Sequence, residues 1–200
     1  MIRWAIPVSV GLIALAVSLP SQAEPRASRR RSASGGSSRY SDEALASEGF
    51  RAATIRRIQQ AQPYVEHASA AFKLPVSTIN AIISCESNFN PSAASSAGAR
   101  GMMQLMPKTQ AGWASEMGIS GSSGDPKFNI YVGTYGFSKL LKRPEVKGDL
   151  NRAIAAWNWG IGNLQKFQQG EKGDLYPAET RGLIACITAR KQKFERAERY

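Results

Sequence analysis

The sequence predicts a mainly α-helical protein that folds as a single domain, with at most a small β-hairpin region. Proline and glycine divide most of the chain into segments of helical length, and one of them carries an apolar stripe at helical spacing, Ile79, Ile82 and Ile83. The glycine-rich run 95–104 is the one stretch whose composition favours short strands or hairpin turns. Two hundred residues, 42% of them hydrophobic, are enough for one domain of ordinary size with extensions.

The first 23 residues, 1–23, have the three-part pattern of a secretory signal peptide. A single arginine, Arg3, precedes the apolar run 5–19, and Pro20 is followed by small residues at positions 21 and 23. The apolar run is short for a membrane span, and an uncleaved N-terminal anchor is the alternative. We therefore expect a periplasmic or secreted protein.

Residues 24–45 are predicted to form a disordered basic linker, followed by the domain proper at 46–200. The linker is rich in serine, glycine and arginine, so the burial of apolar side chains cannot offset the entropy lost on ordering it. The formal net charge of the chain is +11, which favours an anionic partner such as nucleic acid, an anionic membrane or a bacterial cell wall. Because secretion argues against nucleic acid, we expect no nucleic-acid partner.

Proline and glycine positions set the expected helix boundaries. One helix is expected to end before Pro63, because proline is tolerated in the first turn of a helix and disrupts its interior. Gly160 is expected to stop another helix, and the last helix begins near Pro177. The expected helices span 41–62, 63–72, 75–87, 107–117, 126–141, 151–159, 162–169 and 177–200.

The two cysteines, Cys85 and Cys186, leave two interpretations open. In an oxidising compartment an even count favours a disulfide, which would close a loop of about 100 residues and stabilise the fold by about 4.7 kcal/mol. Alternatively, each cysteine is a separate buried thiol that packs as a small hydrophobic side chain.

Glu86 is the candidate for acid–base chemistry because it interrupts an apolar helix face. It occupies the position after Ile82 and Ile83 on that face, where another hydrophobic residue is expected. Burial disfavours an ionised carboxylate and raises its pKa, and a glycosidase uses such a protonated acid to protonate the leaving sugar oxygen. The alternative is a glutamate that turns to solvent at the end of its helix.

Five sequence blocks resemble the soluble lytic transglycosylase family, whose catalytic domain is similar to goose-type lysozyme. They occur in the order and at the separations typical of that family and together cover roughly residues 63–185. The resemblance implies a lysozyme-like fold of the transglycosylase SLT type and peptidoglycan glycan strands as the partner. The blocks are ESNFNP (86–91), SSAGARGMMQLMP (95–107), DPKFNIYVG (125–133), AAWNWGIGNL (155–164) and PAETR (177–181).

The resemblance also implies roles for individual residues. Glu86 would be the catalytic acid/base, Ser95 would position it by hydrogen bonding, and Gln104 and Met106 would contact the sugar. Gln104 is notable in itself, because its amide lies within the apolar run GMMQLMP, where an unpaired amide is costly. The alternatives are a turn residue for Ser95 and ordinary core filling for the methionines.

Three departures from the family pattern fall near the expected site. Trp157 stands where the family has a tyrosine whose hydroxyl lies near the catalytic acid, and an indole N–H donates a hydrogen bond but cannot accept one. The family's Asn158 is kept, and we expect Trp157 and Asn158 to bind substrate, with core packing as the alternative for the tryptophan. Leu183 replaces a second expected tyrosine, and Gly136 and Phe137 stand where Tyr-Leu is common.

No second carboxylate lies near Glu86 in the sequence, since no acidic residue occurs between Glu86 and Glu116. Most glycosidases need a second carboxylate as nucleophile or base. In the family, the C6 hydroxyl of the substrate takes that role. This implies cleavage of the β-1,4 bond between N-acetylmuramic acid and N-acetylglucosamine, with a 1,6-anhydro-muramoyl product. The alternatives are a muramidase of the same fold, in which water attacks, and a catalytically silent wall-binding module.

No metal ion or cofactor is expected. His67 is the only histidine, which argues against a histidine triad or a multi-histidine metal site, and the sequence contains no phosphate-cradling loop. We expect a monomer. The small size of the chain suggests a dedicated role, such as opening the wall for a secretion or flagellar machine.

Overall fold

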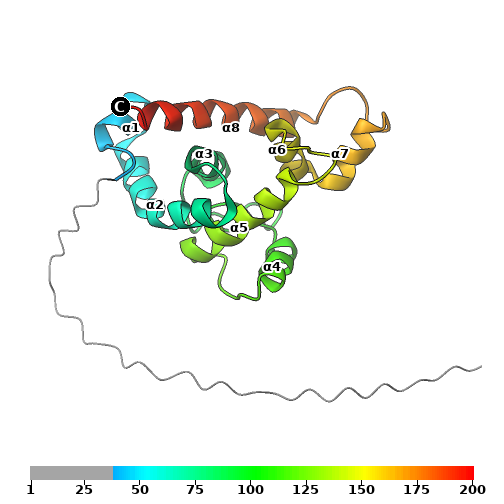
Figure 1. Cartoon of the computed structure of the whole chain (residues 1–200), viewed down its shortest axis with the longest axis horizontal. Helices are drawn as coiled ribbons and strands as arrows, with labels where there is room; N and C mark the ends of the chain where they lie inside the picture. The colour runs from blue at the N-terminus through cyan, green and yellow to red at the C-terminus, as the bar shows by residue number, and fades with distance from the viewer. Residues whose placement is uncertain (1–37) are drawn as a thin grey trace, which may run out of the picture. The chain divides into compact units, whose positions relative to one another are not determined.

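Helix α3 (Val76–Ser87) is the central helix of the computed structural model, which describes residues 38–200. Every residue from 76 to 84 is buried, so α3 is covered on all sides along most of its length. It packs most extensively against α8 (Ala178–Ala197) and also contacts α2 (Ala52–Phe72). In Figure 1, α3 lies beneath α8, between α2 and α6 (Leu150–Trp159).

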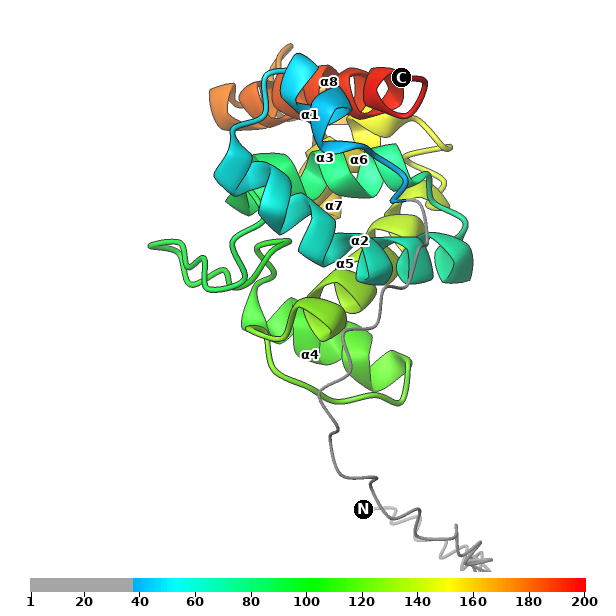
Figure 2. The same cartoon turned by 90° about the vertical axis from the view of Figure 1, so that its left-hand side faces the viewer.

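The other helices complete the fold around α2 and α6. Helix α5 (Pro126–Leu141) packs against both of them, α4 (Pro107–Glu116) packs against α5, and α7 (Ile161–Gln168) packs against α6. Helix α1 (Asp42–Ser47) contacts α2 and α8. Figure 2 shows α8 and α4 at opposite ends of this arrangement.

The predicted fold class is confirmed for residues 38–200. The structure contains no strand there, and only two isolated antiparallel bridges occur, both at Arg100, which pairs with Ala94 and with Leu105. These bridges fall at the glycine-rich run in which a small hairpin was expected. None of the helices in these residues combines the length and the apolar character that crossing a membrane requires.

Side-chain caps and prolines determine where several helices begin. The Ser41 side chain accepts a hydrogen bond from the Ala44 N–H, and Asp149 caps α6 by accepting one from the Arg152 N–H. Helices α4 and α5 begin with proline, whose missing N–H has no helical partner at that position.

The prediction of a helix break at Pro63 is wrong, because α2 continues through that proline. The break lies earlier, at Gly49, whose φ of 82° is left-handed. There the Phe50 N–H donates to the Leu45 carbonyl, which ends α1 in a Schellman-type turn. Proline removes one helical hydrogen bond, and the buried residues on either side of it, Gln62 and Val65, hold α2 together.

The predicted linker 24–45 also extends too far, because residues 40–45 belong to the folded domain. Tyr40 and Leu45 are fully buried, and the Tyr40 ring packs against Phe194 with the centroids 5.6 Å apart. The burial of these two large side chains stabilises the ordered conformation, although the polar composition of the segment suggested disorder. The rest of the predicted linker, up to residue 37, and the predicted signal peptide 1–23 lie outside the described residues.

Candidate active site

A pocket of about 330 Å³ lies where the end of α3 meets α6 and α8. Cys85 and Cys186 are joined by a disulfide, with their Cα atoms 6.1 Å apart, so α3 and α8 are covalently linked at the residue before Glu86. The lining consists of Cys85 and Glu86 from α3, Asn158 from α6, and Glu179, Gly182, Leu183 and Cys186 from α8.

Glu86 reaches this pocket because α3 ends immediately after it. The helix stops at Asn88, which has left-handed backbone angles, so the Glu86 side chain projects from the last turn and is half-buried. Burial raises the pKa of Glu86 to about 7, the Trp157 hydrogen bond opposes this rise, and the nearby Glu179 carboxylate adds to it. The carboxyl group is therefore close to half-protonated at neutral pH.

Trp157 is the hydrogen-bonding partner of Glu86. Its indole Nε1–H donates to Glu86 Oε1 at 2.8 Å, across the contact between α6 and α3. The Trp157 ring stacks on Trp113 with the centroids 5.8 Å apart and the planes at 21°, and it meets Phe137 edge-on at 5.6 Å. Trp157 thus contacts Glu86, but it does not line the pocket, and its ring is packed against other aromatic side chains. Substrate binding by Trp157 stays a prediction.

Glu179 is a second carboxylate in the same pocket, and it lies 93 positions from Glu86 in the sequence. The Asn158 side-chain N–H donates to Glu179 Oε1 at 3.2 Å, and the Thr180 hydroxyl donates to Asn158 Oδ1 at 2.6 Å. Asn158 therefore connects α6 to the beginning of α8. The PAETR block contains Glu179, but this block does not indicate that Glu179 lies close to Glu86.

Ser95, Gln104 and Met106 do not line the pocket around Glu86. The predicted hydrogen bond between Ser95 and Glu86 is absent from the described residues. The Ser95 hydroxyl instead accepts from the Ala99 N–H at 3.0 Å, as expected of a turn residue. Met106 precedes α4 and is 45% exposed.

The Gln104 amide holds the 93–105 loop together. Its side-chain nitrogen donates to the Ala93 carbonyl at 3.1 Å and to the Gly101 carbonyl at 2.9 Å. This explains how a polar side chain fits within an apolar run. The loop is tied to the end of α3 by the Ser87 hydroxyl, which donates to the Met102 carbonyl at 2.7 Å. Sugar contacts by Gln104 and Met106 stay predictions.

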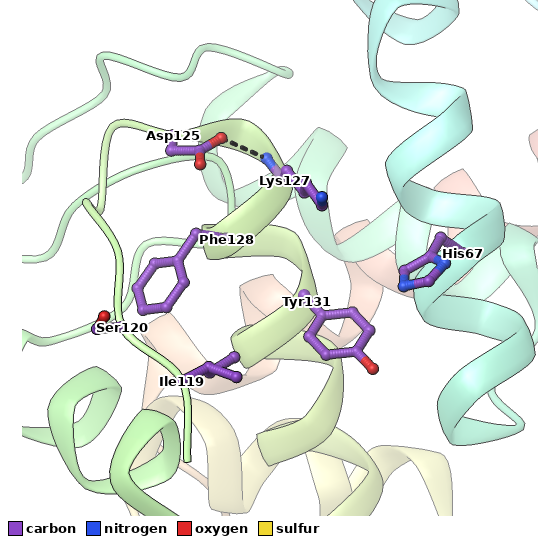
Figure 3. A pocket seen from close by; sticks show the side chains of 7 residues that line it. All are labelled: His67, Ile119, Ser120, Asp125, Lys127, Phe128 and Tyr131. Carbon is purple, nitrogen blue, oxygen red and sulfur yellow. Dashed lines mark hydrogen bonds between the residues drawn. The ribbon is translucent and has the colours of Figure 1, made fainter. Parts of the chain in front are cut away.

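A separate pocket of about 380 Å³ lies between α2 and the start of α5, as Figure 3 shows. His67 stacks there on Tyr131 with the ring centroids 5.2 Å apart, and Asp125 caps α5 by accepting from the Lys127 N–H. This pocket shares no residue with the one around Glu86. Within residues 38–200, no group of three His, Cys, Asp or Glu side chains is arranged to hold a metal ion.

Comparison with known proteins finds relatives of this chain. The chain is 34% identical over 112 residues to a transglycosylase of Enterobacteria phage PRD1, which covers 56% of this chain and 38% of the phage protein. It is 36% identical over 97 residues to an endo-type membrane-bound lytic murein transglycosylase A of Klebsiella pneumoniae, covering 45% of this chain and 47% of that protein. The chain thus spans less than half the length of these relatives.

A solved structure has a similar fold. It is an inactive mutant of the lytic transglycosylase Slt from Pseudomonas aeruginosa, with a TM-score of 0.59 and 25% identity, covering 70% of this chain and 24% of that one. The expected lysozyme-like fold of the SLT type is thereby confirmed. The family model described as the transglycosylase SLT domain matches residues 63–176, more than half of the chain. The chain therefore belongs to the transglycosylase SLT domain family.

Proposed function

We propose that this protein is a peptidoglycan lytic transglycosylase in which Glu86 is the general acid/base. The observation that carries the proposal is a half-buried carboxyl group, with its pKa raised to about 7 by burial, in a pocket of an SLT domain. The matched relatives are named transglycosylases, one of them a lytic murein transglycosylase. The similar Slt structure is of an inactive mutant in which glutamine replaces a glutamate.

The proposed reaction uses one carboxyl group twice. Protonated Glu86 gives its proton to the glycosidic oxygen between N-acetylmuramic acid and N-acetylglucosamine, and the bond from that oxygen to C1 breaks. The Glu86 carboxylate then accepts the proton of the C6 hydroxyl, whose oxygen attacks C1. The product is a 1,6-anhydro-muramoyl end, and Glu86 is protonated again. A pKa near 7 suits both roles, because neither protonation state is scarce.

A muramidase with the same acid is the second candidate function, and Glu179 is the observation that favours it. It is a second carboxylate in the pocket, and a base of this kind is what hydrolytic glycosidases use to activate water. Its Oε1 accepts a hydrogen bond from Asn158, which holds the carboxyl group in one orientation in the pocket.

Digestion of purified sacculi in H₂¹⁸O, followed by mass spectrometry, separates these functions. A lytic transglycosylase releases anhydro-muropeptides without ¹⁸O, whereas a muramidase releases reducing ends that carry one ¹⁸O atom. Glu86→Gln should abolish release. The matched control is Glu116→Gln, because Glu116 is an exposed glutamate paired with Lys139 away from the pocket. Release by Glu86→Gln at the wild-type rate would refute the role of Glu86.

The third reading, a catalytically silent wall-binding module, predicts that wild type and Glu86→Gln both bind sacculi and that neither releases muropeptides. A periplasmic or secreted location is part of the proposal, because the substrate lies outside the cytoplasm. A role for a secretion or flagellar machine stays a prediction, as does the monomeric state. Failed assembly of such a machine in a deletion strain, rescued by wild type but not by Glu86→Gln, would support that role. Normal assembly would refute it.

A further inference from the structure

Side chains from three helices together fix the position of the Trp157 indole. Trp157 lies on α6, Trp113 stacks on it from α4, and Phe137 meets it edge-on from α5. The indole N–H then points at Glu86 Oε1, 2.8 Å away. An aromatic ring held on two sides has little freedom to rotate, so the direction of its N–H is set by the packing.

Gly136 makes this packing possible. A Cβ atom built at Gly136 would lie 2.3 Å from Trp113 Cζ3 and 2.4 Å from its Cε3. These distances are far below van der Waals contact, and a stacked indole has no flexible end that could move aside. Any residue larger than glycine at position 136 would therefore displace Trp113 from the stack. Two of the departures from the family pattern, Trp157 and the Gly136-Phe137 pair, thus meet in a single packing unit.

We propose that Trp157 is a positioning residue that fixes one oxygen of the catalytic carboxyl group, so that the proton Glu86 transfers is always carried by Oε2. This inference rests on the proposed role of Glu86. The reason is that an indole N–H only donates, so Oε1 must accept in both protonation states of Glu86. A tyrosine hydroxyl could donate to the carboxylate or accept from the carboxylic acid and would leave the proton free to occupy either oxygen.

The same hydrogen bond favours the ionised form of Glu86. It acts against burial, which raises the pKa, and against the Glu179 carboxylate on α8, which raises it further. On α3 the neighbouring Cys85 is held in the disulfide and does not titrate, while Trp157 and Asn158 on α6 are neutral. Trp157 therefore limits the rise in the pKa of Glu86. The carboxylate form that the second step of the proposed reaction requires stays accessible.

The test removes the donor and follows Glu86 directly by NMR. The ¹³Cδ resonance of Glu86, assigned from its loss in Glu86→Gln, is titrated with pH, together with the indole ¹H–¹⁵N resonance of Trp157. In the wild type, both should titrate with one midpoint, near 7. Trp157→Phe should raise the Glu86 midpoint by about one to two pH units, the shift that corresponds to one hydrogen bond to a charged group.

Two further variants separate the N–H from the shape of the ring. Benzothienylalanine, placed at position 157 by stop-codon suppression, keeps the ring shape without the N–H and should raise the midpoint as Trp157→Phe does. Gly136→Ala should broaden or shift the Trp157 indole resonance and raise the Glu86 midpoint in part. The matched control is Trp159→Phe. Trp159 lies on the same helix but packs against Phe167 and Tyr176, so the midpoint should not change.

Activity gives a second readout. The pH optimum of muropeptide release by the benzothienylalanine variant should move upward with the Glu86 midpoint, while KM changes little. An unchanged midpoint in a folded benzothienylalanine variant would overturn the proposal. The titration does not depend on activity, so it remains decisive for the hydrogen bond even if Glu86→Gln proves active and the proposed function fails.

Discussion

Replacing Glu86 by glutamine should stabilise the protein at alkaline pH and leave its stability unchanged at acid pH. Burial raises the pKa of Glu86 from its ordinary value of 4.5 to about 7, so the folded state binds the proton more tightly than the unfolded state does. Below pH 4.5, Glu86 is protonated in both the folded and the unfolded state, and the free energy of unfolding has its full value. As the pH rises from 4.5 towards 7, the free energy of unfolding falls, because the unfolded state releases the proton first. Above pH 7, the buried charge lowers the free energy of unfolding by about 3 kcal/mol, at about 1.4 kcal/mol per pH unit.

Glutamine has nearly the same shape as a protonated glutamic acid and still accepts the Trp157 hydrogen bond, but it carries no charge at any pH. Urea denaturation of wild type and Glu86→Gln at pH 4, 5.5, 7 and 8.5 measures the difference directly, and subtracting the two curves cancels the other ionisable groups. The difference should be near zero at pH 4 and reach about 3 kcal/mol at pH 8.5. A difference that is constant across this pH range would refute the reasoning.

Three further predictions concern the stability of the folded domain, and urea denaturation measures each of them. The double variant Cys85→Ser, Cys186→Ser should lose about 2 to 5 kcal/mol, because the bond closes a loop across 101 positions; an unchanged midpoint would show that this constraint does not matter. Gly101→Ala should lose at least about 1 to 3 kcal/mol, since Gly101 has a φ of 78° and an added Cβ would lie 2.3 Å from the Ser123 carbonyl oxygen. Wild-type stability in that variant would mean that the loop adjusts freely. Ile83→Ala should lose about 2 to 5 kcal/mol because Ile83 is fully buried in α3, and a loss below 1 kcal/mol would contradict this central position.

The prediction of Glu86 from sequence depended on a local rule. Helical spacing places position 86 on the face of Ile82 and Ile83, and the half-buried carboxyl group at the end of α3 agrees with that spacing. The donor-only chemistry of Trp157 was also readable from the residue type alone, and in the structure the indole does donate to Glu86. Local periodicity and side-chain chemistry need no knowledge of the fold.

Contacts between distant segments could not be predicted in this way. Glu179 enters the pocket because α8 crosses α3, and no pattern within the PAETR block determines that crossing. The Ser95 hydroxyl accepts from the Ala99 N–H of its own turn, and no hydrogen bond joins it to Glu86 in the described residues. Pro63 does not break α2, because the packing of Gln62 and Val65 keeps the helix intact. For Glu179 and Pro63, tertiary structure decided between locally acceptable alternatives.

The stacked indoles of Trp113 and Trp157 have an optical consequence. Two indoles at 5.8 Å with planes at 21° couple their electronic transitions, and one of the pair donates to the Glu86 carboxyl group. Ultraviolet circular dichroism should therefore contain an exciton couplet from this pair, and its amplitude should follow the charge on the acid. The charge on Glu86 should therefore be measurable in dilute solution without any label, through the absorption of this tryptophan pair.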